Sequence, residues 1–300
     1  MRNPLEPLTR LLPASLRMLG TSQRGDSEQA QRLASILMVE VGELTSIRTG
    51  ARYHYRPFTI AKPDGRQRRL LAPSPALKRL QRRLLEHYLA LLPVHASATA
   101  FRPGLSIVDN ARAHARQQLI ATVDLRDFFE STRAGRVRAF FRRHGWHGEE
   151  LHTLLRLCVY RNGLPQGAPT SPCLSNLVNR PLDERLWGLA LRARAIYTRY
   201  GDDLTFSWNT DNMPSGFQRT VEEAVRSAGY EIQPCKGWQV RSIRERPRVT
   251  GLVLTGNGRV SLPWTLRWRI WGLRWRWWWS ADDATRARLR GYQGYVRMVK

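Results

Sequence analysis

Two adjacent aspartates, Asp202 and Asp203, lie between two apolar, β-prone runs in the stretch YTRYGDDLTFSW. Alone, they are compatible with a hairpin turn, because Asp and Gly are common turn residues. A third carboxylate, Asp124, ends the apolar run LIATVD, which we expect to form a neighbouring strand. Converging carboxylates repel each other unless a cation joins them, and Mg²⁺ prefers oxygen ligands of this kind together with substrate phosphates. The three residues therefore predict a magnesium site for phosphoryl chemistry, in which two ions about 3.5–4 Å apart stabilise the attacking and leaving oxygens.

The elements that position these carboxylates follow the order β-α-β-β-α-β. We expect strands at 119–125, 195–200, 204–208 and 230–233. Several helices fill the first long connection, including one around 174–189 that Pro181 should kink, and a helix at 215–229 precedes the last strand. This order is typical of the split βαβ motif, an antiparallel sheet covered by helices on one face. The fold class is therefore α+β.

Upstream of the first strand, the chain alternates between helical and hairpin patterns. Apolar periodicity predicts helices over 27–41 and 76–92. Between them, the segment RPFTIAKPDGRQRRLLAPS predicts a β-hairpin with its turn at Pro-Asp-Gly.

The composition points to a nucleic-acid partner. The formal net charge is +25, from 49 Lys+Arg against 24 Asp+Glu, and such an excess favours a polyanion. No apolar run approaches the roughly 20 residues that span a bilayer, and the N-terminal stretch does not resemble a signal peptide, so we expect no membrane. The three cysteines, Cys158, Cys173 and Cys235, have no paired spacing. Their pattern argues against a zinc site or a disulfide framework and favours the cytoplasm.

The segments ATVDLRDFF, LPQGAPTSPCLSNL and YGDD closely resemble, in order and spacing, the palm motifs of reverse transcriptases. The resemblance covers roughly residues 55–263 and implies a right-hand polymerase with fingers, palm and thumb. We accordingly expect an N-terminal helical region at 1–50, fingers at 51–118, a palm at 119–245 with finger insertions around 146–170, and a thumb or RNA-binding tail at 246–300.

The resemblance implies an RNA-directed DNA polymerase that adds nucleotides with two metal ions. Asp124 and Asp202 would be the main metal ligands and Asp203 the third carboxylate. The expected cofactor is two Mg²⁺ ions, with Mn²⁺ as an alternative. One departure from the family pattern is Gly201, where alanine is commoner; because glycine is small, we expect no loss of metal binding.

The resemblance also assigns residues around the incoming nucleotide. Phe129 matches the steric gate that excludes a ribose 2′-OH by its volume. Gln166 matches the residue beside the nucleotide and the template. Lys62 and Arg69 match the pair that clamps the triphosphate, and Arg suits bidentate phosphate contact. Lys236 matches the lysine that protonates the leaving pyrophosphate. The structural alternatives are that Phe129 is a core residue and that Lys62 and Arg69 are solvated surface charges.

Two short signatures indicate the bacterial retron type. NARAH, Asn110 to His114, matches a signature between fingers and palm, and VTG, Val249 to Gly251, matches the triplet after the palm. The resemblance implies an enzyme that binds its own structured noncoding RNA and primes from a 2′-OH of an internal guanosine. It would copy part of that RNA, from deoxynucleoside triphosphates, into multicopy single-stranded DNA branched to the RNA. It also implies a role in anti-phage defence with an accessory effector protein. Asn110 and His114 are expected to contact RNA.

The last 63 residues differ from the rest of the chain. From Trp238 to Lys300 there are fourteen Lys/Arg and three Asp/Glu, and seven of the eleven tryptophans lie between Trp264 and Trp279. Trp264, Trp268, Trp271, Trp275 and Trp278 step by four and three, which predicts one helix face packed on a core. Trp277 and Trp279 lie off this stripe and are candidates for stacking on unpaired bases. The interleaved arginines are candidates for RNA phosphate contacts: Arg267, Arg269, Arg274 and Arg276.

Three alternatives remain open at this level. One is a group II intron-like or other defence-associated reverse transcriptase, against which NARAH and VTG argue. A viral RNA-dependent RNA polymerase also carries Gly-Asp-Asp, but Phe129 and the short chain argue against it. The third, from another class, is a non-catalytic structural RNA-binding protein, which would not need all the predicted polymerase residues intact.

Overall fold

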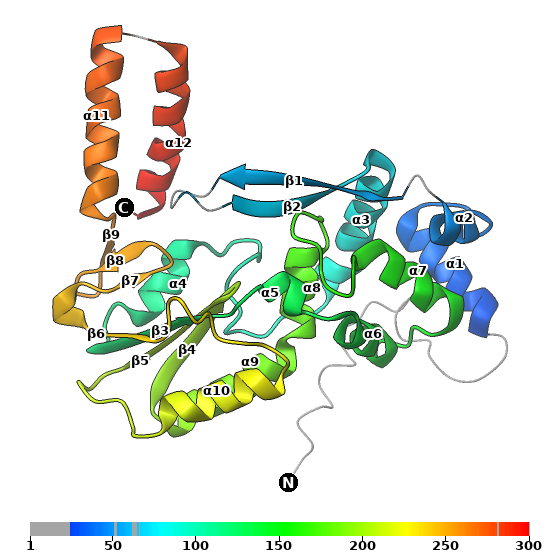
Figure 1. Ribbon diagram of the computed structural model, residues 1–300, viewed down its shortest axis with the longest axis horizontal. Coiled ribbons are helices and arrows are strands. Elements are labelled where there is room, and N and C mark those ends of the chain that lie inside the picture. The colour runs from blue at the N-terminus through cyan, green and yellow to red at the C-terminus, as the bar shows by residue number, and fades with distance from the viewer. Residues whose placement is uncertain (1–24, 51–52, 62–64, 66, 281, 300) are drawn as a thin grey trace. The chain divides into compact units, whose positions relative to one another are not determined.

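The computed structural model describes residues 25–50, 53–61, 65, 67–280 and 282–299. Within these residues the chain forms two compact units (Figure 1). The first combines the chain up to Leu91 with Ala134–Thr170, and the second combines Leu92–Arg133 with the chain from Ser171 onward. The helix at Ile107–His114, expected with the fingers, is part of the second unit. The region 134–170, which includes the expected finger insertion, is part of the first.

The first unit is a helical body that carries a two-stranded hairpin. Its elements are α1 (Gly25–Leu37), α2 (Glu43–Thr49), β1 (Tyr55–Ala61), β2 (Gln67–Pro73), α3 (Pro75–His87), η3 (Leu89–Leu91), α6 (Ala134–Arg143) and α7 (Gly148–Cys158). Strands β1 and β2 pair antiparallel from Tyr55↔Pro73 to Ala61↔Gln67, which confirms the predicted hairpin. The buried Trp146 ring nitrogen donates a hydrogen bond of 2.9 Å to the Tyr88 hydroxyl, within the core of this unit.

The second unit is built on a sheet of four strands within the described residues: β3 (Leu119–Asp124), β4 (Ala195–Tyr200), β5 (Asp203–Trp208) and β6 (Gln239–Ser242). The order is β4-β5-β3-β6, and every pairing is antiparallel. The predicted split βαβ arrangement and the α+β class are therefore confirmed at this level.

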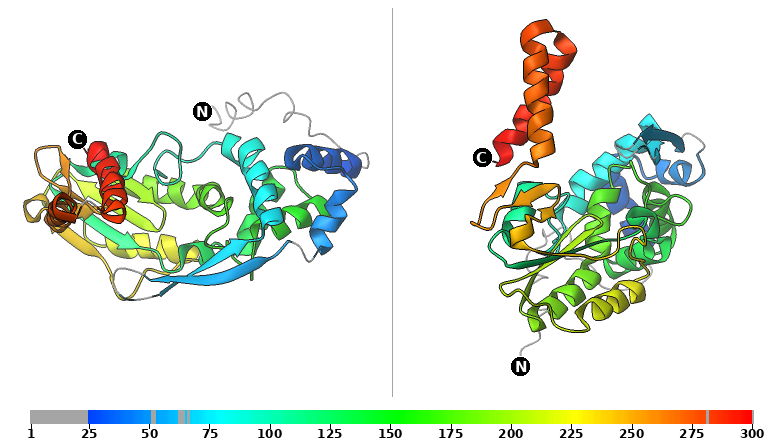
Figure 2. Two further views of the ribbon diagram at one scale, coloured as in Figure 1. Left: turned by 90° about the horizontal axis from the view of Figure 1, so that it is seen from above. Right: turned by 60° about the vertical axis from the view of Figure 1, so that its left-hand side comes forward.

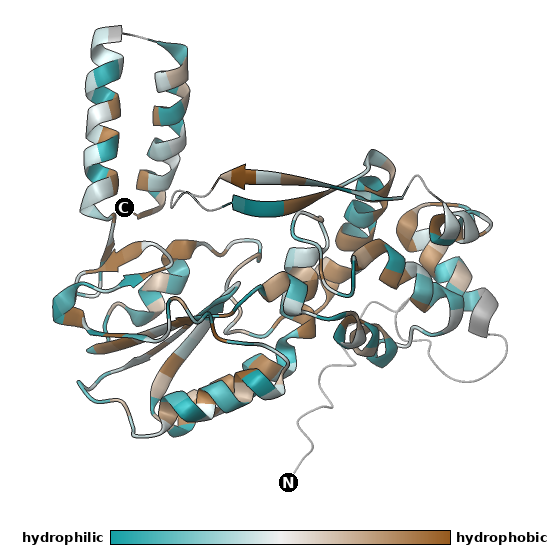
Figure 3. Cartoon of the chain, viewed as in Figure 1, coloured by the Kyte–Doolittle hydropathy of each residue, from teal (hydrophilic) through white to brown (hydrophobic). Residues whose placement is uncertain are grey.

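Helices α9 (Arg180–Arg192) and α10 (Phe217–Ser227) pack on one face of this sheet. Their apolar residues, such as Leu186 and Val221, share one core cluster with Phe206 of β5. In Figure 3, α10 alternates between hydrophilic and hydrophobic patches along its length, as expected for a helix with one buried face. A fully buried ion pair at 2.7 Å between Arg199 of β4 and Asp183 of α9 also joins the two layers.

Two predicted elements differ from the structure. The last strand of the four-stranded sheet is Gln239–Ser242 rather than 230–233; around Ile232 there is only an isolated bridge to Leu125. The long helix expected to kink at Pro181 is instead two helices, α8 (Ser171–Val178) and α9, that break at Asn179. Proline has no backbone N–H to continue the hydrogen-bond ladder of a preceding helix but suits the first turn of a new one, so the break precedes Pro181.

A smaller sheet follows the four-stranded sheet. It consists of β7 (Arg248–Val249), β8 (Leu252–Leu254) and β9 (Val260–Ser261), and it is preceded by η4 (Ile243–Glu245). Helix α4 (Ile107–His114) shares a core cluster with these strands. Residues Phe128–Ser131 form the short helix α5 after β3.

The chain closes with two helices that pack against each other, α11 (Trp264–Ser280) and α12 (Asp283–Val299). Both are seen as neighbours in Figures 1 and 2. Tyr295 and Val299 of α12 pack on the cluster beneath the smaller sheet. The expectation that the α11 tryptophan stripe packs on a core is wrong, because its side chains are between 54% and 70% exposed.

Candidate active site

Two carboxylates of the second unit come from strands that lie side by side. Asp124 ends β3 and Asp203 begins β5, and they are direct partners in the antiparallel register. Both line a cavity of about 190 Å³, together with Lys236, Gly237 and Gly251. The expected juxtaposition of the strand end and the hairpin is therefore confirmed for these two carboxylates.

The electrostatics of this cavity are dominated by the pair. Burial alone would raise the pKa of Asp124, but hydrogen bonds with Asp203 and Lys236 hold it below its ordinary value. Burial and the hydrogen bond with the neighbouring Asp124 raise the pKa of Asp203 well above its ordinary value. The Lys236 ammonium forms an ion pair with Asp124, and this hydrogen bond raises the pKa of Lys236. The Lys236 ammonium therefore offsets part of the negative charge of the site.

This charge balance fits a divalent cation. A carboxyl whose pKa is raised by a second carboxylate marks a point of strongly negative potential. Mg²⁺ takes carboxylate oxygens and is usually bound through one or two of them plus phosphate oxygens. Asp124 and Asp203 supply such oxygens on one cavity wall. These two residues would hold the ion.

Asp202 occupies a different position from its neighbour. Its residue is exposed and does not line the cavity. Its carbonyl accepts a hydrogen bond of 2.9 Å from the Leu125 N–H, which ties the turn to the end of β3. Across the residues that the structure describes, no three acidic, His or Cys side chains are grouped closely enough to hold a metal ion. Successive residues entering a strand point to opposite sides, which separates the Asp202 side chain from that of Asp203. The role of Asp202 as a third metal ligand stays a prediction.

The turn before the aspartates explains the departure from the family pattern. Gly201 has a φ of 66°, in the left-handed region that favours glycine. A Cβ at this position would lie 3.6 Å from the Phe101 ring, an ordinary contact. The backbone conformation, rather than lack of space, therefore favours glycine over alanine.

The predicted steric gate belongs to a cluster of aromatic rings. Phe129 is half-buried, with ring centroids 5.5 Å from Phe128 and 6.0 Å from Phe101. Phe128 is the buried member, stacked on Tyr230 at 5.7 Å. Phe129 thus has one side packed and some surface exposed, and its role as the gate stays a prediction.

Residues predicted to contact the nucleotide also occur in the first unit. The Gln166 carbonyl accepts a hydrogen bond of 2.8 Å from the Leu71 N–H, so its loop adjoins strand β2. A Cβ at Gly167 would approach the Leu71 carbonyl oxygen to 2.7 Å, and its φ is 123°, so glycine is required there. Arg69 is exposed on β2. Lys62 lies outside the described residues, and the roles of Lys62, Arg69 and Gln166 stay predictions.

Two expected RNA contacts are corrected by the structure. Asn110 and His114 are buried at 1% and 0% exposure, so neither side chain is available to RNA. His114 bonds through Nδ1 to the Ser207 hydroxyl at 2.6 Å and through Nε2 to the Thr198 hydroxyl at 2.8 Å. Asn110 accepts a hydrogen bond of 2.7 Å from the Thr99 hydroxyl. The NARAH signature therefore joins α4 to the strands on either side of the Gly-Asp-Asp turn.

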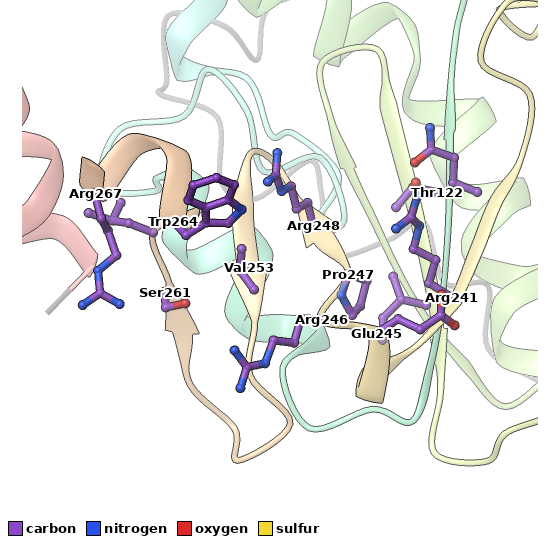
Figure 4. A pocket seen from close by; sticks show the side chains of 13 residues that line it. Thr122, Arg241, Glu245, Arg246, Pro247, Arg248, Val253, Ser261, Trp264 and Arg267 are labelled. Atoms are coloured by element: carbon purple, nitrogen blue, oxygen red, sulfur yellow. The ribbon is translucent and has the colours of Figure 1, made fainter. Parts of the chain in front are cut away.

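The motif reading missed a basic pocket of about 520 Å³ next to the carboxylates (Figure 4). Arg241, Arg246, Arg248 and Arg267 line it, with Glu245 as the one acidic residue among its lining residues. Thr122, Gln239 and Arg248 also line the carboxylate cavity, so the two cavities adjoin. Its arginines lie on three separate elements and on one turn. The only signal of this pocket in the sequence was therefore the local excess of Arg.

Comparisons with known proteins identify the family of this chain. The sequence model of the family "Reverse transcriptase (RNA-dependent DNA polymerase)" matches residues 60–252. The chain belongs to the reverse transcriptase family. The matched region contains β3, the Gly-Asp-Asp turn and Lys236.

Relatives of this reverse transcriptase indicate the retron type. It is 39% identical to the retron Mx162 reverse transcriptase of Myxococcus xanthus over 236 residues, covering 69% of this chain and 48% of the relative. It is 36% identical to the retron Ec86 enzyme of Escherichia coli, covering 68% of this chain and 64% of the relative. With the retron Ec83 reverse transcriptase of Escherichia coli the identity is 32%, covering 70% and 71% respectively. These matches place the chain among the retron-type reverse transcriptases, although it spans only about half of the Mx162 enzyme and less than two thirds of the Ec86 enzyme.

Proposed function

We propose that this protein is a retron RNA-directed DNA polymerase that copies part of a cognate structured RNA into multicopy single-stranded DNA. The observation that carries this proposal is the Asp124–Asp203 pair, placed by β3 and β5 at one cavity with the ammonium of Lys236. The retron relatives support the choice of RNA as template and of deoxynucleoside triphosphates as substrates.

Each of the predicted site residues would have its own role in nucleotide addition. Asp124 and Asp203 would hold Mg²⁺ at the cavity, and Asp202 would be the third carboxylate that the family resemblance implies. Two such ions would supply positive charge to triphosphate oxygens. Lys236, whose raised pKa keeps it charged, would donate a proton to the leaving pyrophosphate. Phe129 would exclude the ribose 2′-OH, and Lys62, Arg69 and Gln166 would contact the nucleotide from the fingers.

The finer assignments rest on the family resemblance and on charge. Priming from a guanosine 2′-OH, a branched RNA–DNA product and anti-phage defence with an accessory effector protein are part of the proposal. The basic pocket and the exposed arginines of α11 support RNA binding by the second unit. Among the described residues no helix has the length and apolar character to cross a bilayer.

The direct test is primer extension by the purified chain on an RNA template with Mg²⁺ and deoxynucleotides. Asp124→Asn and the double variant Asp202→Asn, Asp203→Asn should lose DNA synthesis and keep RNA binding, because amides lack the charge that holds the ion. If the wild-type protein binds RNA but synthesises no DNA, the non-catalytic RNA-binding alternative is favoured instead. Near-normal extension by the double variant would refute the site.

Sequencing the nucleic acid that copurifies with the protein tests the retron assignment separately. The expected result is one structured RNA joined to a single-stranded DNA copy of part of it. Unbranched DNA copied from unrelated RNAs would favour another defence-associated or intron-like reverse transcriptase.

A further inference from the structure

Helix α11 carries an exposed row of six tryptophans, here called the tryptophan ribbon: Trp264, Trp268, Trp271, Trp275, Trp278 and Trp279. Their side chains are 54–70% exposed. From Trp268 onward neighbouring rings touch, with centroids 5.1–6.0 Å apart, and the Trp271 and Trp275 rings are nearly parallel at 22°. Trp279, expected off the stripe, contacts both Trp275 and Trp278. An aromatic surface this contiguous marks an interaction site.

The ribbon has positive charge on both sides and none of the opposite sign on its own helix. Helix α11 contains four arginines and no Asp or Glu. At about 100° per residue, Arg267 and Arg274 lie on one side of the ribbon and Arg269 and Arg276 on the other. All four residues are exposed. The occupant of this face must therefore be anionic and must offer surfaces that stack on indole rings.

The ribbon also begins where the basic pocket ends. Trp264 and Arg267 line that pocket and line a further cavity with Trp268 and Trp271. The basic pocket in turn shares three lining residues with the Asp124–Asp203 cavity. A connected series of cavities therefore runs from the carboxylates to the ribbon within the second unit.

We propose that the tryptophan ribbon is a stacking platform for an unpaired stretch of RNA. Unpaired RNA combines phosphates, which suit the flanking arginines, with free base faces, which stack on aromatic side chains without regard to sequence. A duplex hides those faces, and an apolar protein or lipid surface supplies none. The choice of RNA rests on the proposed function; the stacking geometry does not.

The test measures the affinity of the full chain for a labelled 12-nucleotide unpaired RNA, the matching RNA duplex and a DNA strand of the same sequence. Three central ring positions are changed together: Trp268→Leu, Trp271→Leu and Trp275→Leu. Since each base–aromatic stack contributes about 1–3 kcal/mol, the triple variant should bind the unpaired RNA at least about 10-fold more weakly. Duplex affinity should change less than about 2-fold on the same reasoning. Quenching of tryptophan fluorescence by the unpaired RNA should fall with it.

Two matched variants separate stacking from other roles. The triple Phe variant at the same positions keeps the rings and should stay within about 3-fold of wild type. Trp187→Leu removes a tryptophan of α9 that is 49% exposed and outside the ribbon, and should leave the affinity unchanged. Equal binding by the Leu and Phe variants would overturn the proposal, because the surface would then be a general apolar docking site. So would an equal loss for duplex RNA, a loss confined to the DNA strand, or a wild-type dimer that the Leu variant abolishes.

Primer extension on a preformed RNA–DNA duplex with a short unpaired template overhang keeps this proposal distinct from the enzymatic one. The Leu variant should extend such a duplex at a rate close to that of wild type. If the wild-type chain extends no primer while the Leu variant still binds unpaired RNA more weakly than wild type, the enzymatic proposal fails and the ribbon proposal stands.

Discussion

At the residue scale, the proposed metal site would make nucleotide addition depend on the charge of the Asp124–Asp203 pair. Asp124→Asn should lower the rate of primer extension by at least about 100-fold, because metal-ion charge stabilisation contributes several kcal/mol and each 1.36 kcal/mol is tenfold in rate. Single-turnover extension at saturating Mg²⁺ measures it. Glu231→Gln, which removes an exposed carboxylate outside the cavity, is the matched control. A less than tenfold effect of Asp124→Asn would exclude this pair as the ligand of a catalytic ion.

The position of Phe129 supports a test of nucleotide choice. Phe129→Ala should raise ribonucleotide incorporation relative to deoxynucleotide by about 10-fold or more, because steric discrimination of about 1–3 kcal/mol corresponds to 10- to 200-fold. Competition between the two nucleotide types during extension measures it. Phe129→Tyr keeps the ring volume and should retain the selectivity. Unchanged selectivity in an active Ala variant would leave Phe129 as part of the aromatic cluster with Phe101 and Phe128.

The buried imidazole of His114 gives a prediction about pH. Burial lowers its pKa to about 3, so it is neutral in the folded chain, whereas in the unfolded chain it titrates near 6.5. The unfolded state then binds the extra proton, so stability is complete above about pH 6.5 and falls as the pH drops towards 3. Between pH 7.5 and 5 the loss should be about 2 kcal/mol. Urea unfolding of the wild type and His114→Gln at both pH values checks this, and the variant should show a shallower dependence; equal slopes would contradict it.

At the element scale, the arginines of α11 can be tested apart from its tryptophans. Changing Arg267, Arg269, Arg274 and Arg276 together to Gln keeps the ribbon and removes four potential phosphate contacts. With about 0.9 counterions released per phosphate of a duplex, the slope of log affinity against log salt should flatten by up to ~3–4. The slope is obtained from RNA affinities measured between about 50 and 200 mM salt. An unchanged slope would mean that these arginines do not contact phosphate.

The elements also show what sequence reasoning can and cannot reach. The β3 strand, the Gly-Asp-Asp hairpin and the β1–β2 hairpin have strong local signals, and all three are confirmed. The position predicted for the last strand of the four-stranded sheet was wrong by several residues, because its partner on β3 is distant in sequence and its own apolar signal is weak.

The same limit applies to burial. A tryptophan stripe at helical spacing predicts a core-facing helix, yet the α11 ribbon is exposed. Conversely, Asn110 and His114 are polar and were assigned to RNA, yet they are buried against Thr99, Thr198 and Ser207. Periodicity identifies a face of a helix, and only tertiary contacts decide what lies against that face.

At the scale of the whole molecule, the two units are interleaved along the chain. The first unit receives its last segment when Ala134–Thr170 is complete, whereas the sheet of the second unit begins with β3, before that segment. Strand β3 is the central partner of both β5 and β6, and both follow it in the chain. The sheet therefore cannot form in the order in which its strands are made.

This interleaving has a consequence on the ribosome. At about 5–20 residues per second, the 118 residues between Asp124 and Ser242 (242 − 124) take about 6–24 s to synthesise. Throughout that time β3, with its apolar Ile120, Ala121 and Val123, lacks at least one of its two partner strands, and until Trp208 has been made it lacks both. The nascent chain must stay unaggregated for this interval, and its dependence on chaperones should follow the speed of translation across 125–242.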